Sequence, residues 1–380
     1  MTAFRELPGA ILVPDLDVPA HYGEPLAEQR ALAEGRALVD LSHRGVILVE
    51  GADRLSWLHS MTSQQLTGLR PGVSTETMLL DPNGRIERAI RLVDDGERAW
   101  LLVDEGSAQP LTEFLTRMRF ALRVSVRDAS DEFAAVLAFA GPAADLLRSA
   151  APVAVWEDPW RGVLPGGVQY AKTAEHAGAE WSAAQFVFPR TELAALAARV
   201  AAGEAQAAGL LALDALEVRA WRPAQHADVD ERAIPHELDW LRTAVHLTKG
   251  CYRGQETIAK VHNLGHPPRR LVLLHLDGSG GSLPEAGALV FRAGEAQTPG
   301  ARPVGRVTRA ALHYEWGGIA LALLKRSVPE DAELEVRGGE HGADAQADPA
   351  SITEVIAAAQ EVIVPSDAGA AREIPRLKRL

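Results

Sequence analysis

The last third of the chain carries the pattern that most restricts the fold. Five short segments rich in aliphatic residues follow one another from Arg269, separated by turns that contain Gly or Pro: RRLVLLHLDG, GALVFRAG, PVGRVTRAALH, GIALALLKR and AELEVRG. Strands of this length at this spacing are typical of a small barrel or sandwich. We therefore predict an all-β C-terminal domain over residues 267–350 and a partly disordered tail over 351–380.

The chain before this domain mixes two periodicities. Residues 75–106 hold three strand patterns joined at DPNG and DDGE, which predicts an antiparallel meander. Apolar residues recur at helical spacing in 24–35, 52–61 and 210–221. Helices combined with hairpin-like links between strands indicate the α+β class rather than a parallel, doubly wound sheet.

The length of 380 residues exceeds what one ordinary hydrophobic core supports. We predict a first α+β domain over 1–151 and a second over 152–266, the latter opening with a strand at 163–171. Residues 222–268 show little periodicity, and a loop of that length inside a compact domain is usually functional or disordered.

Composition narrows the classes of function. Apolar residues make up 47% and charged residues 24%, as in an ordinary globular protein. A net charge of −12 argues against gripping nucleic acid over a broad surface. A single cysteine excludes an intramolecular disulfide framework and fits a reducing compartment. No signal peptide or membrane-spanning stretch is evident, so we expect a cytoplasmic protein.

That single cysteine stands in KGCYRGQE (249–256). Thiolate is the reactive form of cysteine, and Lys249 and Arg253, two residues to either side of Cys251, would favour it. Gly254 allows a ligand to approach the backbone closely. The remaining residues supply a stacking ring, an amide and a carboxylate that could pair with a heteroaromatic ring edge: Tyr252, Gln255 and Glu256. The alternative is that Cys251 is a small buried hydrophobe.

Two nearby features have more than one interpretation. His262 and His266, with Cys251, could form a three-ligand metal site, but the residues between them read as a turn, so we predict no metal. PPRRL (267–271) is the entry into a strand, yet adjacent arginines at a domain junction can hold a carboxylate or phosphate. Because strand residues alternate in direction, only one of these arginines would face a cleft, and we choose Arg269.

KGCYRGQE, followed by this β entry, resembles the YgfZ family of folate-binding proteins, which is similar in fold to the T-protein (aminomethyltransferase) of the glycine cleavage system. Supporting similarities are VDLSHRGVILVEGADRLSWLHSMTS (39–63), the DPNG hairpin, IPHELDW (234–240) and VGRVTRA (304–310). The resemblance implies a three-domain, clover-like arrangement around a central folate cavity, with a C-terminal antiparallel β-barrel. It also implies a role in assembling or repairing iron–sulfur proteins.

Carried onto this sequence, the resemblance makes Cys251 the functional thiol, with Lys249 beside it. It places tetrahydrofolate or another folate against a set of residues that includes most of the motif loop: Tyr252, Arg253, Gly254, Gln255, Glu256, Arg219, Glu87 and Arg269. The partners it implies are folate and iron–sulfur assembly or client proteins, without nucleic acid or membrane.

Two departures from the T-protein pattern matter. Paired acids follow its hairpin turn, whereas this chain has Glu87 and then Arg88, which argues against aminomethyl transfer. The helix motif R-[IL]-E-A-G reads EVRAW (217–221) here. A guanidinium has only donors, so Arg219 cannot accept from a pterin amino group. Another acid such as Glu256 takes that task, the pterin sits differently, or folate binding is weakened; alternatively, Glu217 and Arg219 are solvated helix charges.

Three hypotheses follow. The first is a folate-binding accessory protein for iron–sulfur assembly, in which Cys251 acts with a partner because one cysteine cannot hold a cluster. The second is a tetrahydrofolate-dependent aminomethyltransferase. The third is a non-enzymatic module that senses folate.

Overall fold

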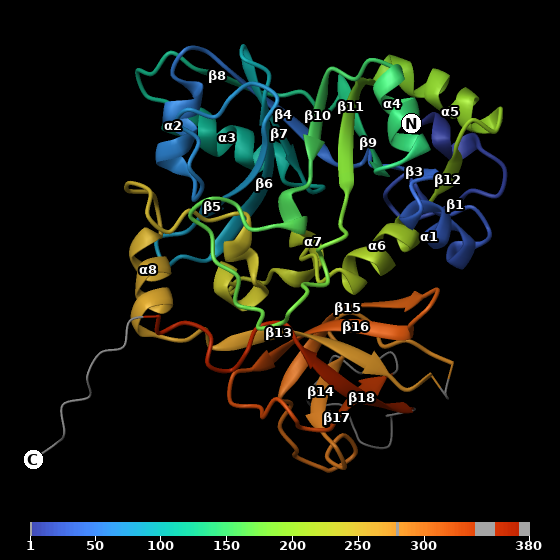
Figure 1. Ribbon diagram of the computed structural model, residues 1–380, viewed down its shortest axis with the longest axis vertical. Coiled ribbons are helices and arrows are strands. Elements are labelled where there is room, and N and C mark those ends of the chain that lie inside the picture. The colour runs from blue at the N-terminus through green and yellow to red at the C-terminus, as the bar shows by residue number, and fades with distance from the viewer. Residues whose placement is uncertain (1, 279–280, 339–353, 372–380) are drawn as a thin grey trace, which may run out of the picture.

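The computed structural model describes residues 2–278, 281–338 and 354–371. Two five-stranded sheets lie side by side in the upper half of Figure 1, and a closed six-stranded barrel lies below them. The α+β class and the C-terminal barrel are therefore confirmed. A small two-stranded sheet near the N-terminus pairs β1 (Ile11–Leu12) with β2 (Pro19–His21).

The first sheet has the order β5-β6-β7-β4-β8 and is antiparallel throughout. The predicted meander is confirmed as three of its strands. At the hairpin turn, the Asp81 carboxylate accepts hydrogen bonds from the backbone N–H groups of Asn83 and Arg85 at 2.7 and 2.8 Å. Gly84 completes the turn with a φ of 76°, which favours glycine. The strands are β4 (Gly45–Glu50), β5 (Ser74–Leu80), β6 (Ile86–Asp94), β7 (Arg98–Val103) and β8 (Ser125–Asp128).

The second sheet has the order β10-β11-β9-β3-β12 and crosses the boundary predicted at residue 151. Its strands come from both sides of that boundary, so the two predicted α+β domains are not separate along the chain. Sequence periodicity can indicate where strands form, but it does not indicate which strands pair with one another. The strands are β3 (Ala37–Asp40), β9 (Phe133–Phe139), β10 (Ala154–Glu157), β11 (Ala183–Pro189) and β12 (Gln206–Ala208).

The barrel closes in the order β13-β16-β15-β14-β17-β18, with β18 returning to β13. Its last strand lies beyond the boundary predicted at 350, within the segment that we expected to be a tail. Ile363 and Val364 just after it are fully buried, which places this segment in the core. Residues 372–380 of the predicted tail lie outside the described residues. The strands are β13 (Arg269–Leu276), β14 (Leu289–Arg292), β15 (Gly305–His313), β16 (Gly317–Lys325), β17 (Leu334–Gly338) and β18 (Glu354–Val362).

The helices agree with the predicted apolar spacing in most places. The α-helices are α1 (Pro25–Ala33), α2 (Arg54–Met61), α3 (Ala108–Met118), α4 (Pro142–Ser149), α5 (Leu193–Ala201), α6 (Leu210–Arg219), α7 (Gln225–Asp228) and α8 (Gln255–Leu264). Short 3-10 helices are η1 (Ala3–Glu6), η2 (Pro159–Arg161), η3 (Arg190–Glu192), η4 (Pro235–Leu238) and η5 (Trp240–Arg242).

Two predictions about irregular segments were wrong. Residues 163–171 form no strand; their backbone N–H groups instead donate to the carbonyls of Leu241 and Arg242 in η5. Residues 222–268 are not one long loop, because they contain α7, η4, η5 and α8. His262, which we placed before a turn, lies inside α8, and its imidazole is 3.1 Å from the Tyr170 hydroxyl.

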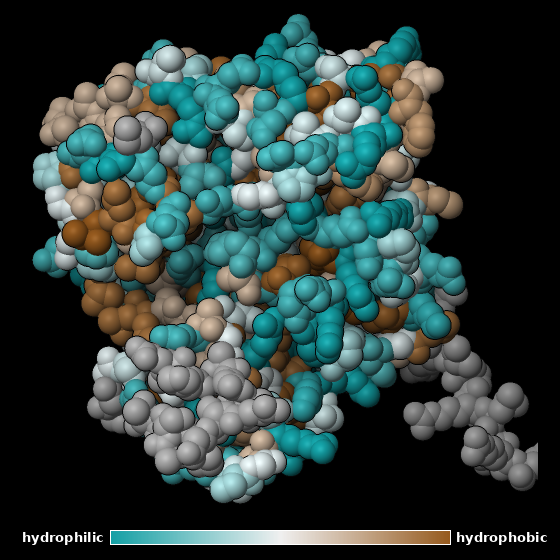
Figure 2. All heavy atoms as spheres, turned by 180° about the vertical axis from the view of Figure 1, so that it is seen from behind, coloured by the Kyte–Doolittle hydropathy of each residue, from teal (hydrophilic) through white to brown (hydrophobic). Residues whose placement is uncertain are grey.

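The largest hydrophobic cluster joins the sheets to the barrel. Leu271 and Leu323 from the barrel share it with Val39 from the second sheet and Met78 from the first. In the rear view of Figure 2, hydrophilic side chains cover most of the middle of the face and apolar ones gather along its left edge. Because one core spans all three parts, the sheets and barrel hold one another in place.

Candidate functional site

The KGCYRGQE loop packs against the DPNG hairpin turn, and Gly254 makes this contact possible. Gly254 precedes α8 with a φ of 84°. A Cβ at this position would lie 2.6 Å from the Asp81 carbonyl oxygen and 3.0 Å from the Gly84 Cα. Only glycine fits without a shift of backbone, so the loop and the hairpin form one unit.

Lys249 anchors the start of this loop. Its Nζ donates to the backbone carbonyls of Thr62 and Gln64 at 2.6 and 3.0 Å, and also to that of His59, at the end of α2. Burial lowers the pKa of Lys249 to about 8. The ammonium is thus held inside the protein, whereas Cys251 is exposed. The expected pairing of Lys249 with the thiol does not describe this arrangement.

The structure does bring Glu87 and Arg253 together. Arg253 Nη1 lies 2.8 Å from Glu87 Oε2, and the guanidinium also lies 5.6 Å from the ring centroid of Phe114 in α3. The other motif residues have separate places. The Tyr252 ring is buried beneath the Lys249 ammonium, the Gln255 amide donates to the Lys249 carbonyl, and Glu256 is exposed.

A cavity of about 290 Å³ lies beside this ion pair, between the start of β6, the end of β7 and α7. Carboxylates dominate its polar lining. The lining residues are Ile86, Glu87, Arg88, Asp104, Glu105, Ser107, Gln225, His226, Val229, Asp230 and Glu231. We call this space the Glu87 cavity.

Asp104 is the buried carboxylate of the Glu87 cavity. Burial opposes its ionisation, but Arg91, with Nη1 at 2.8 Å, and the nearby His226 and Arg44 outweigh burial and hold the pKa of Asp104 well below its usual range. A hydrogen bond to Asp104 in turn raises the pKa of His226, whose Nδ1 lies 3.5 Å from Asp104 Oδ2. The cavity therefore holds a carboxylate with a lowered pKa next to an imidazole with a raised pKa.

Arg88 adds a donor to the same cavity. Its Nη1 donates to the Glu87 carbonyl at 2.5 Å, but its buried Nε has no hydrogen-bond partner among the residues that the structure describes. Buried polar atoms are rarely left unpaired. The cavity thus offers a ligand acceptors on its carboxylates and a donor in the Arg88 Nε–H group.

Arg269 does not line this cavity, but it forms an ion pair with Asp230, which does. It donates to Asp230 at 2.6 Å and to Glu237 at 2.7 Å, so its guanidinium is already matched by two carboxylates. Burial opposes ionisation of Asp230, but the Arg269 bonds outweigh it and lower its pKa to about 2. Arg270 instead lies inside the barrel wall, where it donates to the Val328 carbonyl.

Glu217 and Arg219 are not simply solvated helix charges. Glu217 is buried and accepts from Arg309 of β15 at 2.6 Å, which ties α6 to the barrel. Arg219 is half-buried at the end of α6, with its guanidinium 3.5 Å from the ring centroid of Trp316. Among the predicted folate residues, Glu87 lines the Glu87 cavity, Arg219 lines a different cavity, and the others line neither.

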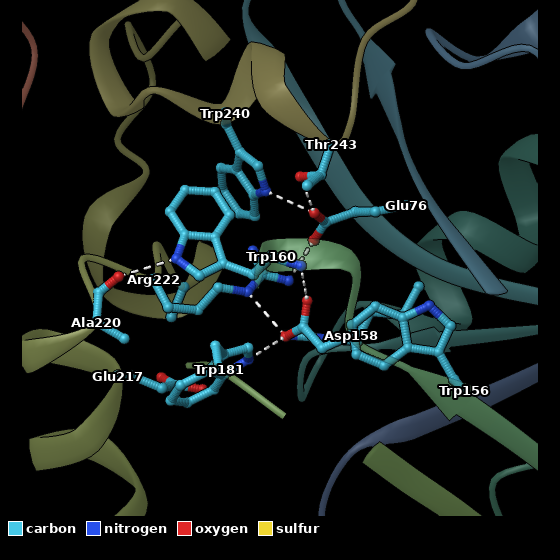
Figure 3. Close-up of polar contacts among 12 residues, drawn as sticks. Glu76, Trp156, Asp158, Trp160, Trp181, Glu217, Ala220, Arg222, Trp240 and Thr243 are labelled. Atoms are coloured by element: carbon cyan, nitrogen blue, oxygen red, sulfur yellow. Dashed lines mark hydrogen bonds and ion pairs between the residues drawn. The ribbon is translucent and has the colours of Figure 1, made fainter. Parts of the chain in front are cut away.

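Side chains fill the space where β5, η2 and η5 meet (Figure 3). Arg222 bonds to Glu76 at 2.7 Å and to Asp158 at 3.0 Å, and the Trp240 indole donates to Glu76 at 2.9 Å. The Trp160 ring packs over the Arg222 guanidinium. The resemblance implied a central folate cavity, but this point of the molecule is a packed polar cluster, and the Glu87 cavity lies elsewhere.

Sequence reasoning missed Asp104 and His226. They are 122 residues apart, in a turn after β7 and in a four-residue helix, and neither segment has a motif that singles it out. Among residues 2–278, 281–338 and 354–371, no group of three His, Cys, Asp or Glu is arranged to hold a metal ion. No helix in this part of the chain is long and apolar enough to cross a membrane.

Comparisons with known proteins agree with the architecture. Residues 13–168 match the family described as GCVT N-terminal domain. An aminomethyltransferase of Thermus thermophilus is 29% identical over 330 residues, covering 84% of this chain and 88% of the relative. That of Symbiobacterium thermophilum is 28% identical over 304 residues, covering 76% and 80%.

A solved structure gives the same result for the fold. The crystal structure of glycine cleavage system aminomethyltransferase T from Bartonella henselae is 20% identical, has a TM-score of 0.71 and covers 97% of this chain and 96% of that one. The expected GcvT-like arrangement with a C-terminal barrel is confirmed. Residues 13–168 thus resemble the GCVT N-terminal domain, and nearly the whole chain has the fold of that aminomethyltransferase structure.

Proposed function

We propose that this protein is a tetrahydrofolate-dependent one-carbon transferase of the aminomethyltransferase type, with the Glu87 cavity as its active site. The observation that carries the proposal is the set of charges in that cavity: Glu87, buried Asp104 and Asp230 beside His226. Relatives named aminomethyltransferase align with most of the chain and support the same reaction. This differs from our first hypothesis, which placed transfer second.

The lining fits both reactants. A folate presents ring N–H and amino donors, for which Asp104 and Asp230 supply acceptors, and ring acceptors, for which the free Arg88 Nε supplies a donor. The amino group of an aminomethyl donor is positively charged when it is protonated, and nearby carboxylates stabilise that charge. The volume of about 290 Å³ suits the reacting end of such a ligand rather than the whole molecule.

Asp104 can supply the charge that the altered acid pair lacks. Arg88 stands where the T-protein pattern has its second acid, and the Glu87 carboxylate is engaged by Arg253. Asp104 faces the same cavity from the end of β7 and stays ionised. We therefore assign Asp104 the role of holding the positively charged donor, with His226 as the neighbouring proton carrier.

The test measures methylene-tetrahydrofolate formed from tetrahydrofolate and an aminomethyl donor. Wild type should turn over, and Asp104→Asn should lower turnover about 100-fold, because one positioned charge contributes a few kcal/mol. Glu97→Gln, on an exposed side chain, is the matched control and should keep full activity. No turnover by wild type, with the donor accepted by a known aminomethyltransferase, would refute the transferase proposal.

A second candidate has one observation in its favour. Cys251 is exposed, on a loop that Lys249 and Gly254 fix in place, as a thiol that works with another protein must be. In this role the protein binds folate and assists iron–sulfur assembly or repair without turnover. Cys251→Ser should then lower iron–sulfur enzyme activities in cells while leaving tetrahydrofolate affinity unchanged. Unchanged enzyme activities would exclude it.

Calorimetric titration with tetrahydrofolate separates these two functions from the third. Binding without turnover and without an effect of Cys251→Ser supports a folate-sensing module. Absence of binding removes folate from all three.

A further inference from the structure

The Glu87 cavity opens where strand β6 separates from strand β7. The two strands pair only through residues 91–94 of β6 and residues 99–102 of β7. Because β6 already begins at Ile86, residues 86–90 have no partner in β7. Backbone groups on that open side need other partners wherever they are buried. The contacts that replace β7 there therefore determine the shape of the cavity wall.

The pairing of the same stretch with β5 is irregular at Glu87. Two neighbouring residues of β5 face Ile86 and Arg88, so Glu87 between them has no opposite residue in β5. One extra residue in a strand is the mark of a β-bulge, which changes the direction of a side chain and is common next to active sites. The start of β6 thus carries an irregularity on one side and an open edge on the other.

The side chain of Gln225, the first residue of α7, covers this open edge. Its Oε1 accepts from the Ala89 N–H at 2.5 Å, and its Nε2 donates to the Glu87 carbonyl at 3.0 Å. A residue of a neighbouring parallel strand would bond to the same pair of backbone groups. The Gln225 amide therefore takes the place of the missing strand and fixes the backbone on both sides of Arg88.

The other end of α7 is attached to the barrel. Asp228, its last residue, is fully buried, and its Oδ2 lies 3.0 Å from Nη2 of Arg309 in β15. The same oxygen accepts from the Ala224 N–H at 2.8 Å, just before the helix. A helix of four residues is thus held at one end by the first sheet, through Gln225, and at the other end by the barrel.

His226 lies between these two attachments and follows Gln225 directly. Its backbone N–H donates to Asp104 Oδ2 at 3.3 Å, and its imidazole Nδ1 lies 3.5 Å from the same oxygen. Both distances are long for N–H···O hydrogen bonds. The His226 side chain is also 47% exposed, so little packing restrains it. The position of the imidazole therefore depends on how firmly α7 is held, and Gln225 is the nearest attachment.

We propose that Gln225 is a positioning residue, which holds His226 against Asp104 and fixes the start of β6 in the wall of the Glu87 cavity. Its amide is engaged by the backbone of β6 through both oxygen and nitrogen, so it acts through His226 rather than on the reacting atoms. The catalytic consequence rests on the proposed transferase function, in which His226 carries the proton. The placement of His226 itself is measurable without turnover.

NMR of folded variants tests the placement. Gln225→Met keeps the length of the side chain and removes both hydrogen bonds. The pKa of His226 should then fall toward that of an ordinary histidine, because the hydrogen bond to Asp104 is what raises it. The Ala89 N–H, which loses its acceptor, should exchange with solvent about 10-fold faster.

A second variant and a matched control accompany this measurement. Gln225→Asn keeps the amide but is one methylene group shorter, so it cannot span the same two backbone groups and should show the same changes. Gln297→Met makes the same substitution at an exposed position between β14 and β15, and should change neither the His226 pKa nor the exchange at Ala89. A His226 pKa equal to that of wild type in a folded Gln225 variant overturns the proposal.

Kinetics of methylene-tetrahydrofolate formation test the catalytic consequence. Gln225→Met should lower kcat about 10-fold and change the KM for tetrahydrofolate less, because a displaced proton carrier slows the reaction while the carboxylates that bind the ligand remain. A wild-type kcat in folded Gln225→Met also overturns the proposal. If wild type shows no turnover, the transferase function fails, and the NMR measurements still decide whether Gln225 places His226.

Discussion

Replacing Lys249 by Met tests how the KGCYRGQE loop is anchored. The wild-type ammonium donates to three backbone carbonyls at the end of α2. Three such bonds at about 1.5 kcal/mol each contribute about 4–5 kcal/mol. Burial opposes this: it lowers the pKa of Lys249 from 10.5 to about 8, which corresponds to about 3 kcal/mol. Lys249→Met should therefore destabilise the protein by only about 1–2 kcal/mol at pH 7.

The sign of the pH dependence is the sharper test. Between pH 8 and 10.5 the unfolded chain keeps the Lys249 proton, whereas the folded protein loses it. Because the unfolded state binds more protons in this window, folding stability of wild type rises with pH relative to the variant. The stability difference between the two proteins should grow by about 2 kcal/mol from about pH 7 to about pH 9.5.

Urea denaturation of both proteins, followed by tryptophan fluorescence at each pH, measures this difference, since other titrating groups cancel. Lys260→Met, at an exposed position of α8, is the control and should show no such trend. A difference that stays constant or shrinks as the pH rises would refute the reasoning. It would mean that the three carbonyls, rather than burial, determine the protonation of Lys249.

The other predictions concern the loop, the central cluster and the Glu87 cavity. Gly254→Ala should lower stability by about 1–3 kcal/mol in urea denaturation, because its Cβ would contact the Asp81 carbonyl and its φ is positive. Arg222→Met should lower it by about 3–5 kcal/mol, since two buried carboxylates lose their cation; a smaller loss at neutral pH would show that they are already protonated. The bond to Asp104 raises the pKa of His226, so its stabilising contribution is full below pH 6.5 and disappears as the pH rises above the folded pKa. The stability gap between wild type and His226→Gln should close accordingly, and NMR titration of His226 should give a pKa above that of an ordinary histidine.

Local structure was predictable wherever periodicity and turn chemistry coincide. The meander over 75–106 follows from alternating residues around DPNG, in which Asp81 bonds to the turn backbone as such turns require. The strand predicted at 163–171 does not form, because this segment has alternating apolar residues but no partner strand. Its backbone bonds to an irregular segment instead. The start of α8 was hidden because Gly254, which reads as a loop residue, initiates the helix.

The site was predictable only in part, for a related reason. Glu87 and Arg253 carry a motif signal, and the structure joins them. Asp104 and His226 carry none, since their environment comes from strands and loops distant in sequence. Lys249 is a cation near a cysteine in the sequence, but its long side chain reaches the carbonyls at the end of α2 instead. Sequence proximity does not report side-chain direction.

The pairing of β3 has a consequence for how the chain is made. β3 lies between β9, almost a hundred residues downstream, and parallel β12, which ends at Ala208. During synthesis the second sheet therefore cannot be completed until more than half of the chain has left the ribosome, while the meander of the first sheet can form from neighbouring hairpins. A fragment cut at residue 151 would expose the β9 edge that β11 covers, and such an open edge invites aggregation. Expression of partial chains should therefore end after β12 rather than at the apparent boundary.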